Sequence, residues 1–540
     1  MSLAVPNQLN YQEGILPVAI ESRSNKRIFE PINGVSFKPN ANNVIRFNIN
    51  SDNLWDITHS YLQCVYTNDT AVGAAGAGNA NGHTDDARGT VGTVALDVGI
   101  PWLNRVQIMS GGQELENIDN YNRLHAMLLS VQGNPQQAGE LSLTTKQNFP
   151  QVAASNPAAV LSAAEKAQAA LTITTVDTTD AQIRDYVEAI GNVAIARLNT
   201  RANALSEDSL DRHSHPKNQS QGIKRTEKFT YNVNIISAIL NTSKYFPLIF
   251  SNLGLDVLLY LEDAVNIGVY AEGDETHQCV PAYTIDNCKW HCHLVDVDRT
   301  FYDRLRQSMM STGGVLTFSG TSYKHYLEEK TNETKHILSI PTRVKSLNSL
   351  WIRPQRSNLN NNNKHFCLSV GEGLQVSEYL FRIGSMQYPQ QSVKFSQDNK
   401  GELYSEIRKC IGVLGNYGHS SFINDISLNL GPTTVNSTTT ALATCANTLA
   451  KVTGLQTTGQ DQKAGTFRSS TVLTYGFEGF AKTAAESGIN VSDRALPVMC
   501  EVTRANPTGG EGNQSIRYDI FAQVDFILYL SADGTMSTRV

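Results

Sequence analysis

Alternating apolar and polar residues mark the predicted strands of this chain. Ile45, Phe47 and Ile49 alternate with polar residues, and residues 61–66 form a second early strand pattern. A period of two is typical of a strand that buries one face. Because the run near the C-terminus ends in a fully apolar stretch, we expect it to cross a whole sandwich and to be buried at one end. Its apolar residues occupy every second position: Tyr518, Ile520, Ala522, Val524, Phe526, Leu528 and Leu530.

Two amphipathic helices are predicted, and each follows a similar segment. Four residues of the segment 103–113 recur at one constant spacing in the segment 380–390: Leu103, Arg105, Met109 and Gln113 become Leu380, Arg382, Met386 and Gln390. A helical period of 3.6 residues then places apolar side chains on one face after each segment. These are Tyr121, Leu124, Met127, Leu128 and Val131 in the first half, and Leu403, Ile407, Cys410, Ile411 and Leu414 in the second.

Further matches keep the same order in both halves of the chain. A strand carries Thr230-Tyr231 in the first half and Thr474-Tyr475 in the second. We align residues 246–248 with residues 496–498, and the segment Asp256–Leu261 with Asp525–Leu530. Because repeated order indicates repeated structure, we interpret the chain as two copies of one β-rich domain.

The division into domains follows from these repeats. Residues 1–30 are polar and rich in turn-forming residues, and we expect an arm there rather than part of a core. The first domain spans 31–300 and contains an insertion at 134–220. The second spans 301–540 and contains an insertion at 431–468. The predicted fold class is all-β: two tandem antiparallel eight-stranded jelly-roll sandwiches with helical and loop insertions.

The insertions and one loop have distinctive compositions. The insertion at 134–220 is rich in Ala, Gln, Thr and Ser, and residues 157–170 and 181–205 within it have helical patterns. Residues 71–82 form a loop of Gly, Ala and Asn. Long insertions at matching positions of a β domain usually carry surface contacts.

Composition excludes several classes of protein. The net charge is −6 and no Lys/Arg run is present, which argues against tight binding to nucleic-acid phosphates. The eight cysteines are scattered in a large chain, unlike a disulfide framework. We see no pattern of a secretory signal and no apolar run of about 18 residues, so we expect no membrane span.

One segment combines metal-ligating residue types. Cys288, His291, Cys292 and His293 are followed by Asp296 and Asp298. Two His at alternate positions of a strand occur in the metal sites of cupins, where a Glu and a third His complete the set. Here the Glu position holds Asp296, and the second repeat has no equivalent. We therefore favour a plain strand with Trp290 and the cysteines on its buried side.

No other residues form a recognisable catalytic set. The chain contains no nucleophile elbow and no phosphate-binding loop. The acidic pairs Glu116 with Asp119, and Glu262 with Asp263, have the character of ordinary surface pairs. Arg105 and Arg382, which recur, suggest structural ion pairs or interface contacts. We assign no catalytic residue, no cofactor-binding residue, no metal ligand and no cofactor.

Two stretches resemble a known family. The segment from Arg382 to Pro389, followed by residues 403–409, is similar to part of the capsid proteins of Polinton-like viruses and virophages. Residues 245–248, leading into Asp256–Leu261, resemble a passage in members from large DNA viruses. With two fused jelly rolls and matched insertions, the chain resembles the double jelly-roll major capsid proteins of the adenovirus and tectivirus lineage.

The resemblance implies a structural function and not an enzyme. Members assemble as homotrimers that form pseudo-hexameric capsomers of an icosahedral virion shell. The implied partners are the chain itself, neighbouring capsomers, and penton and minor or cement proteins, with no sequence-specific nucleic acid; an internal membrane is left open. The insertions would form outer towers or the top contacts of the trimer, and residues 1–30 an inner arm.

Three other functions stay open from the residues. One is a spike or another virion protein, and one is a lectin-like glycan-binding protein. The third is a two-sandwich enzyme, cupin-like or glycan-processing, which would need a complete cluster of carboxylates or His ligands.

Overall fold

The protein is described here from a computed structural model. The described residues, apart from short gaps within these ranges and a few isolated positions, are 22–72, 94–132, 223–270, 279–311, 314–357, 371–414, 471–477, 487–504 and 515–540. The predicted insertions at 134–220 and 431–468, including both predicted helices of the first one, lie outside these ranges. So does most of the loop at 71–82.

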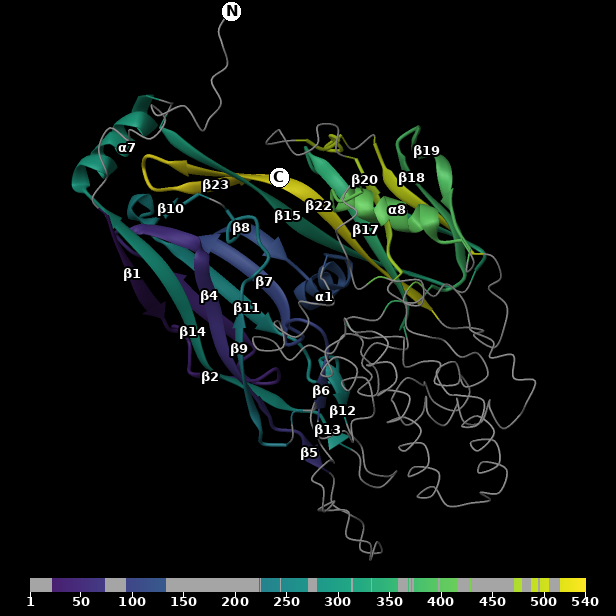
Figure 1. Ribbon diagram of the computed structural model, residues 1–540, viewed down its shortest axis with the longest axis horizontal. Helices are drawn as coiled ribbons and strands as arrows, with labels where there is room; N and C mark the ends of the chain where they lie inside the picture. Colours follow the sequence, from purple (N-terminus) through teal and green to yellow (C-terminus); the bar gives the residue numbers. More distant parts are fainter. Residues whose placement is uncertain are drawn as a thin grey trace, which may run out of the picture.

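The first half of the chain forms two facing antiparallel sheets (Figure 1). One sheet has the strand order β1-β14-β4 and then β9 and β10 along the far side of β4, with the short β2 paired to β14. Their bounds are β1 (Ser22–Phe29), β2 (Ser36–Phe37), β4 (Leu54–Asn68), β9 (Lys228–Val233), β10 (Phe246–Pro247) and β14 (Tyr283–Val297). The other sheet has the order β3-β11-β7-β8, with β3 (Val44–Ile49), β7 (Leu103–Ser110), β8 (Gln113–Ile118) and β11 (Leu255–Leu261).

The second half repeats this arrangement. Its first sheet has the order β15-β22-β17-β20, with β15 (Val315–Lys330), β17 (Leu347–Arg356), β20 (Leu473–Gly476), β22 (Ile516–Ser531) and the added β23 (Met536–Arg539). Its second sheet has the order β16-β21-β18-β19, with β16 (Lys335–Ile340), β18 (Val376–Ile383), β19 (Met386–Lys394) and β21 (Val498–Arg504). In each half a four-stranded sheet faces a larger one, which has six strands in the first half and five in the second. Two facing antiparallel sheets with this crossed order form a jelly roll, so the predicted pair of jelly rolls is confirmed.

Short elements complete the described chain. Two small ribbons pair β5 (Ala71–Val72) with β13 (Cys279–Val280), and β6 (Val94–Leu96) with β12 (Gly268–Tyr270). A 3₁₀ turn, η5 (Leu248–Phe250), follows β10. The helices are α1 (Tyr121–Gln132), α7 (Arg299–Ser311) and α8 (Gly401–Cys410). Among the described residues, no helix is long and apolar enough to span a membrane.

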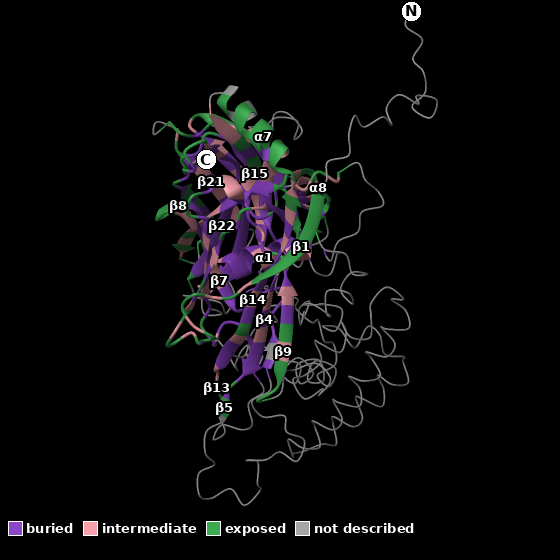
Figure 2. Cartoon of the chain, turned by 90° about the vertical axis from the view of Figure 1, so that its left-hand side faces the viewer, coloured by how far each residue is buried: buried purple, intermediate pink, exposed green. Residues whose placement is uncertain are grey.

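The two predicted amphipathic helices, α1 and α8, are both present and follow equivalent hairpins. Helix α1 is largely buried, whereas α7 and β1 are largely exposed (Figure 2). In Figure 1, α1 lies where the two jelly rolls meet. Helix α7, which the sequence analysis did not predict, joins β14 of the first half to β15 of the second.

Strand β22 is buried along almost its whole length, not only at one end as predicted. It pairs with β15 on one side and with β17 on the other. The first half of the chain packs against the polar beginning of β22. Tyr518 and Ile520, at that beginning, are therefore as inaccessible as Leu530 at the other end. Of the polar residues at that beginning, Asp519 forms an ion pair with Arg123 of the first half, and Arg517 forms an ion pair with Asp519.

The expected arm over residues 1–30 is wrong for residues 22–29. These residues form β1, which pairs in register with β14 from Ser22 opposite Val297 to Phe29 opposite Trp290. Most of its side chains are exposed, so the strand has no apolar alternation to reveal it. Backbone hydrogen bonding to the edge of β14 forms the strand instead.

The repeat is confirmed in its order of elements, but the proposed alignment of residues is wrong. The hairpin after β7 turns at Gly111, and the hairpin after β18 turns at Gly384. Both have positive φ, +58° and +59°, and a Cβ on either would strike an equivalent leucine, Leu253 or Leu496. The predicted match of residues 103–113 with residues 380–390 places Gly384 opposite Gln107 instead of Gly111, so this match is out of register.

Two other predicted alignments are also wrong, because they match segments that are not equivalent in the fold. Strand β11, with Asp256–Leu261, pairs with β7, and its counterpart beside β18 is β21 rather than β22. The match of Asp256–Leu261 with Asp525–Leu530 therefore joins strands of different sheets. The residues preceding β11 and β21 are Gly254 and Pro497, so Pro247 and Pro497 are not equivalent either. Alternating strands look alike in sequence whichever sheet they join.

Candidate functional site

The Cys288–His293 segment lies in the middle of β14. Cys288, Trp290 and Cys292 are buried in the core, as predicted. The Trp290 ring packs edge-to-face on Phe47 of the facing sheet, with centroids 5.5 Å apart. Burial raises the pKa of the Cys292 thiol, so this thiol stays protonated and acts as a small core residue.

The two histidines lie on the other face of β14 and contact different partners. His291 stacks on Tyr61 at 4.6 Å, and its Nε2 lies 3.1 Å from Oε1 of Gln63. Burial, and then the charges of Lys26 and Lys289, lower the pKa of His291. The ring of His293 lies 5.8 Å from that of His59. Among the described residues, no three His, Cys, Asp or Glu side chains are placed to hold a metal ion.

In each of the two acidic pairs the glutamate is buried, so the predicted surface character is wrong for Glu116 and Glu262. Asp119 and Asp263 are exposed, as predicted. Glu116 is buried and accepts hydrogen bonds from the hydroxyls of Ser237 and Ser322 and from the backbone N–H of Ala238, at 2.9 Å for the last. Ser322 belongs to β15, so this carboxylate joins the two jelly rolls. Burial raises the pKa of Glu116.

Glu262, at the end of β11, is also buried. It accepts hydrogen bonds from the side-chain amides of Asn122 at 2.8 Å and Asn266 at 2.9 Å. This carboxylate fixes the start of α1 against β11 and has no exposed face for substrate chemistry.

The recurring arginines form ion pairs within their own jelly rolls. Nε of Arg105 lies 3.1 Å from Oδ1 of Asp119, and its guanidinium covers the ring of Tyr260. Nε of Arg382 lies 2.7 Å from Oε1 of Glu501. The predicted structural role is confirmed, although the two positions are not equivalent in the fold.

The strongest cluster of charges lies between the jelly rolls, and the sequence analysis missed it. Arg123 of α1 and Asp519 of β22 are 3% and 1% exposed, and Nη1 of Arg123 lies 3.2 Å from Oδ2 of Asp519. The same Nη1 donates to Oε1 of Gln355, on β17, at 2.8 Å. An ion pair so deeply buried is costly unless further groups satisfy it.

Other residues of the second half satisfy this pair. Nε and Nη2 of Arg517 donate hydrogen bonds to both carboxylate oxygens of Asp519, and Nε2 of His325 lies 3.0 Å from Oδ1 of the same carboxylate. The cations Arg123 and Arg517 and the bond to His325 hold the pKa of Asp519 far below its usual range, against the effect of burial. Nearby Arg353 is also buried, and burial together with Arg123 lowers its pKa to about 10.

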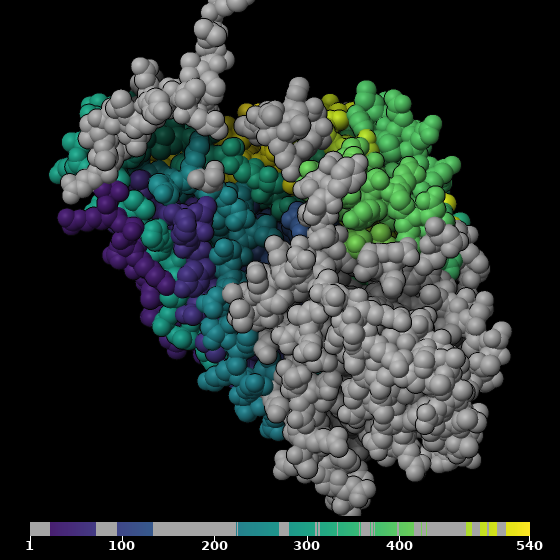
Figure 3. Space-filling view, in the orientation of Figure 1, coloured from purple at the N-terminus to yellow at the C-terminus, as the bar shows by residue number. Residues whose placement is uncertain are grey.

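This cluster joins residues that are far apart in the sequence, so no local motif could have revealed it. The one signal available was the presence of Arg517 and Asp519 in the most apolar strand of the chain. Charged residues are rarely buried without partners. Figure 3 shows the first half, purple to teal, beside the green and yellow second half that the cluster joins.

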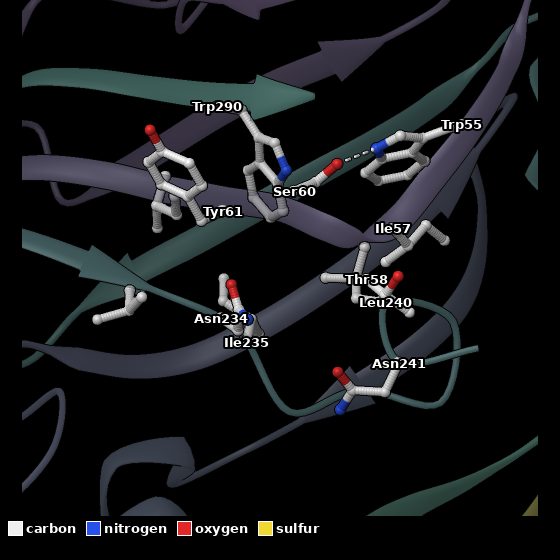
Figure 4. A pocket seen from close by; sticks show the side chains of 12 residues that line it. Trp55, Ile57, Thr58, Ser60, Tyr61, Asn234, Ile235, Leu240, Asn241 and Trp290 are labelled. Atoms are coloured by element: carbon white, nitrogen blue, oxygen red, sulfur yellow. Dashed lines mark hydrogen bonds between the residues drawn. The ribbon is translucent and has the colours of Figure 1, made fainter. Parts of the chain in front are cut away.

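A pocket of about 210 Å³ opens beside β4 (Figure 4). Its floor is apolar and includes Trp55, Leu62 and Trp290, and its rim carries Asn234 and Asn241. It is separate from the cluster between the jelly rolls.

The strand order and the joined pair of sandwiches define the double jelly-roll fold. No family model matches the chain, and no curated protein matches it in sequence. Among solved structures, the major capsid protein of Faustovirus aligns with a TM-score of 0.51 and 10% identity, covering 95% of this chain and 91% of the other. A chain from the structure of the Sputnik virophage aligns with a TM-score of 0.51 and 12% identity, covering 100% and 93%. At these identities the shared feature is the fold.

Proposed function

We propose that this protein is a major capsid protein that assembles as pseudo-hexameric homotrimers in an icosahedral virion shell. The observation that carries the proposal is the pair of jelly rolls with the same strand order, fused in one chain. The fold is shared over nearly the full length with the Faustovirus major capsid protein. Three such chains around an axis present six similar sandwiches, which suits six-fold positions of a shell.

The buried contact between the jelly rolls supports this function. A capsomer needs both sandwiches of a subunit at a fixed angle, because all six must meet their neighbours in the shell. The Arg123–Asp519 pair and the Glu116–Ser322 hydrogen bond fix that angle from two places. Because both contacts are directional, we propose that they specify one geometry of the two sandwiches.

We propose the following division of the chain for this role. The first jelly roll extends from β1 to about residue 300 and the second over 301–540. The insertions at 134–220 and 431–468 form the outer towers or the top contacts of the trimer. The residues before β1 form the arm that links capsomers.

The proposed partners are other copies of the chain, with penton and minor or cement proteins, in the shell of the virion. The protein acts on no substrate in this proposal and binds no specific nucleic-acid sequence. A net charge of −6 accords with the latter.

The native mass tests this proposal. Light scattering after size exclusion should give three times the chain mass of 59.2 kDa, or 177.6 kDa. A trimer interface between subunits of this size should exceed roughly 2,000 Å², so the mass should not change on dilution. Hexagonal outlines in negative-stain images would support the capsomer. A stable 59.2 kDa monomer would overturn the trimer and return the enzyme and glycan-binding functions to consideration.

A further inference from the structure

The pocket beside β4 lies at a gap in the first sheet. On this side of β4, strand β9 pairs with residues 62–67 and β10 pairs with Leu54 and Trp55. Neither strand pairs with residues 56–61. On the other side, Tyr61 pairs with His291 and Asp56 with His293, so β4 also bulges between these two positions. Bulges of this kind redirect side chains and occur beside binding sites.

The bulge is held in place by its own hydrogen bonds. Oγ of Ser60 accepts from Nε1 of Trp55 at 2.8 Å and from the backbone N–H of His293 at 3.0 Å, and it donates to the carbonyl oxygen of Asp56 at 2.6 Å. The Asp56 carboxylate accepts from the hydroxyl of Thr58 at 2.7 Å. The pocket therefore has a preformed wall, which lowers the entropic cost of binding.

The lining divides into a buried apolar floor and an exposed polar rim. Seven buried residues form the floor: Trp55, Ile57, Leu62, Val233, Ile235, Leu240 and Trp290. Thr58, Asn234 and Asn241 are exposed at the rim. Figure 4 shows Trp55 and Trp290 beside the bulge, with Asn234 and Asn241 on the segment across from it. This is the usual design of a small-molecule site, an apolar cavity with a few polar groups.

Charge and size restrict the class of ligand. The twelve lining residues include no Asp, Glu, Lys, Arg or His, so a charged ligand would lose its hydration without a counter-ion. The volume of about 210 Å³ exceeds that of an engineered cavity of about 150 Å³ that binds benzene. Nε1 of Trp290 is buried and has no hydrogen-bond partner, so the floor also has a spare donor.

We propose that this pocket binds a small neutral molecule with one or two rings and a hydrogen-bonding substituent. The rings lie against Trp290, Leu62 and Leu240, and the polar substituent lies toward Asn234 and Asn241. This proposal goes beyond the capsid function and does not rest on it, because the lining belongs to a single chain and requires no contact between subunits.

Ligand-observed NMR on the full-length protein tests the site. The probes are indole and benzyl alcohol, with benzoate and benzylamine as charged compounds of similar size. Saturation transfer should reach the two neutral probes and stay at background for the charged ones. Asn234→Trp, which fills the exposed rim, should reduce the transfer to background. Asn232→Trp is the matched control, because Asn232 lies on the same segment outside the pocket, and it should leave the transfer unchanged.

The opposite results would overturn the site. They are no transfer to either neutral probe, equal transfer to charged probes, or full transfer in the Asn234→Trp variant. If Asn234→Trp does not give the wild-type melting temperature, Asn241→Trp is the second variant, because Asn241 also lies on the exposed rim of the pocket. Retention of transfer in a folded Asn241→Trp protein would contradict the proposal equally.

Discussion

The buried ion pair between the jelly rolls gives a sharp prediction about stability. Replacing Arg123 with Met keeps much of the volume and removes the charge that faces Asp519. Both side chains are almost inaccessible, at 3% and 1% exposure, so water cannot replace the lost partner. Removing one member of a buried pair costs about 3–5 kcal/mol. Because Asp519 keeps Arg517 and His325, we expect the low end, about 3 kcal/mol.

Urea denaturation followed by tryptophan fluorescence measures this cost. Trp102 lies in the first jelly roll and Trp351 in the second, so both halves contribute to the signal. If the pair couples the two jelly rolls, Arg123→Met should also separate a single transition into two. The wild type should unfold in one transition.

A matched variant separates burial from charge. Arg105→Met makes the same chemical change at an ion pair with Asp119, where the two side chains are 34% and 50% exposed. Pairs this exposed contribute at most about 1 kcal/mol. The reasoning fails if the two variants lose the same free energy of unfolding, or if Arg123→Met loses less than about 1 kcal/mol.

Three further predictions concern pH and close packing. The pKa of Glu116 is raised in the folded state, so its contribution is present below the unfolded pKa of about 4.3 and declines as the pH rises through the folded value. In urea titrations, the stability of wild type relative to Glu116→Gln should therefore fall as the pH rises above about 4.3. A difference that does not change with pH would contradict this. The pKa of Asp519 is lowered in the folded state, so its contribution to stability is present above about pH 3.9 and is lost as the pH falls toward the folded value. In Asp519→Asn, the free energy of unfolding, followed by circular dichroism, should therefore depend less on pH in the acid range than in wild type. A Cβ on Gly320 would lie 2.7 Å from the carbonyl oxygen of Ala238, so Gly320→Ala should lower the free energy of unfolding, measured by thermal melts, by about 1–3 kcal/mol. Gly401→Ala is the control, because its Cβ would meet no atom closer than 3.8 Å, and it should not lower this free energy.

The strands and helices that the sequence predicted are those whose side chains face one core. Residues 44–49 and Tyr121–Gln132 have the periods of an element with one buried face, and both are present. The fold class and the repeated order of elements followed from such local patterns. Strand β15 was missed because its burial does not alternate regularly along its length.

The sequence did not predict the register of the strands or which strands pair with one another. A strand with alternating apolar residues shows which face is buried, but not which neighbour it pairs with. The match of β11 to β22 was wrong because both carry an Asp followed by apolar residues. The hairpin glycines Gly111 and Gly384 mark the true equivalence, since their positive φ is needed at the same turn.

The sequence by itself determined the two-fold repeat of β sandwiches, because hydrophobic periodicity is a local property of the chain. Only the tertiary structure decided which polar groups are buried. Arg123, Glu116 and Asp519 look like surface residues in sequence, yet they lie between the jelly rolls. The same holds for the pocket, which exists because β9 and β10 leave part of β4 without a partner strand. Contacts between distant segments depend on the packing of whole sandwiches, and no local pattern encodes them.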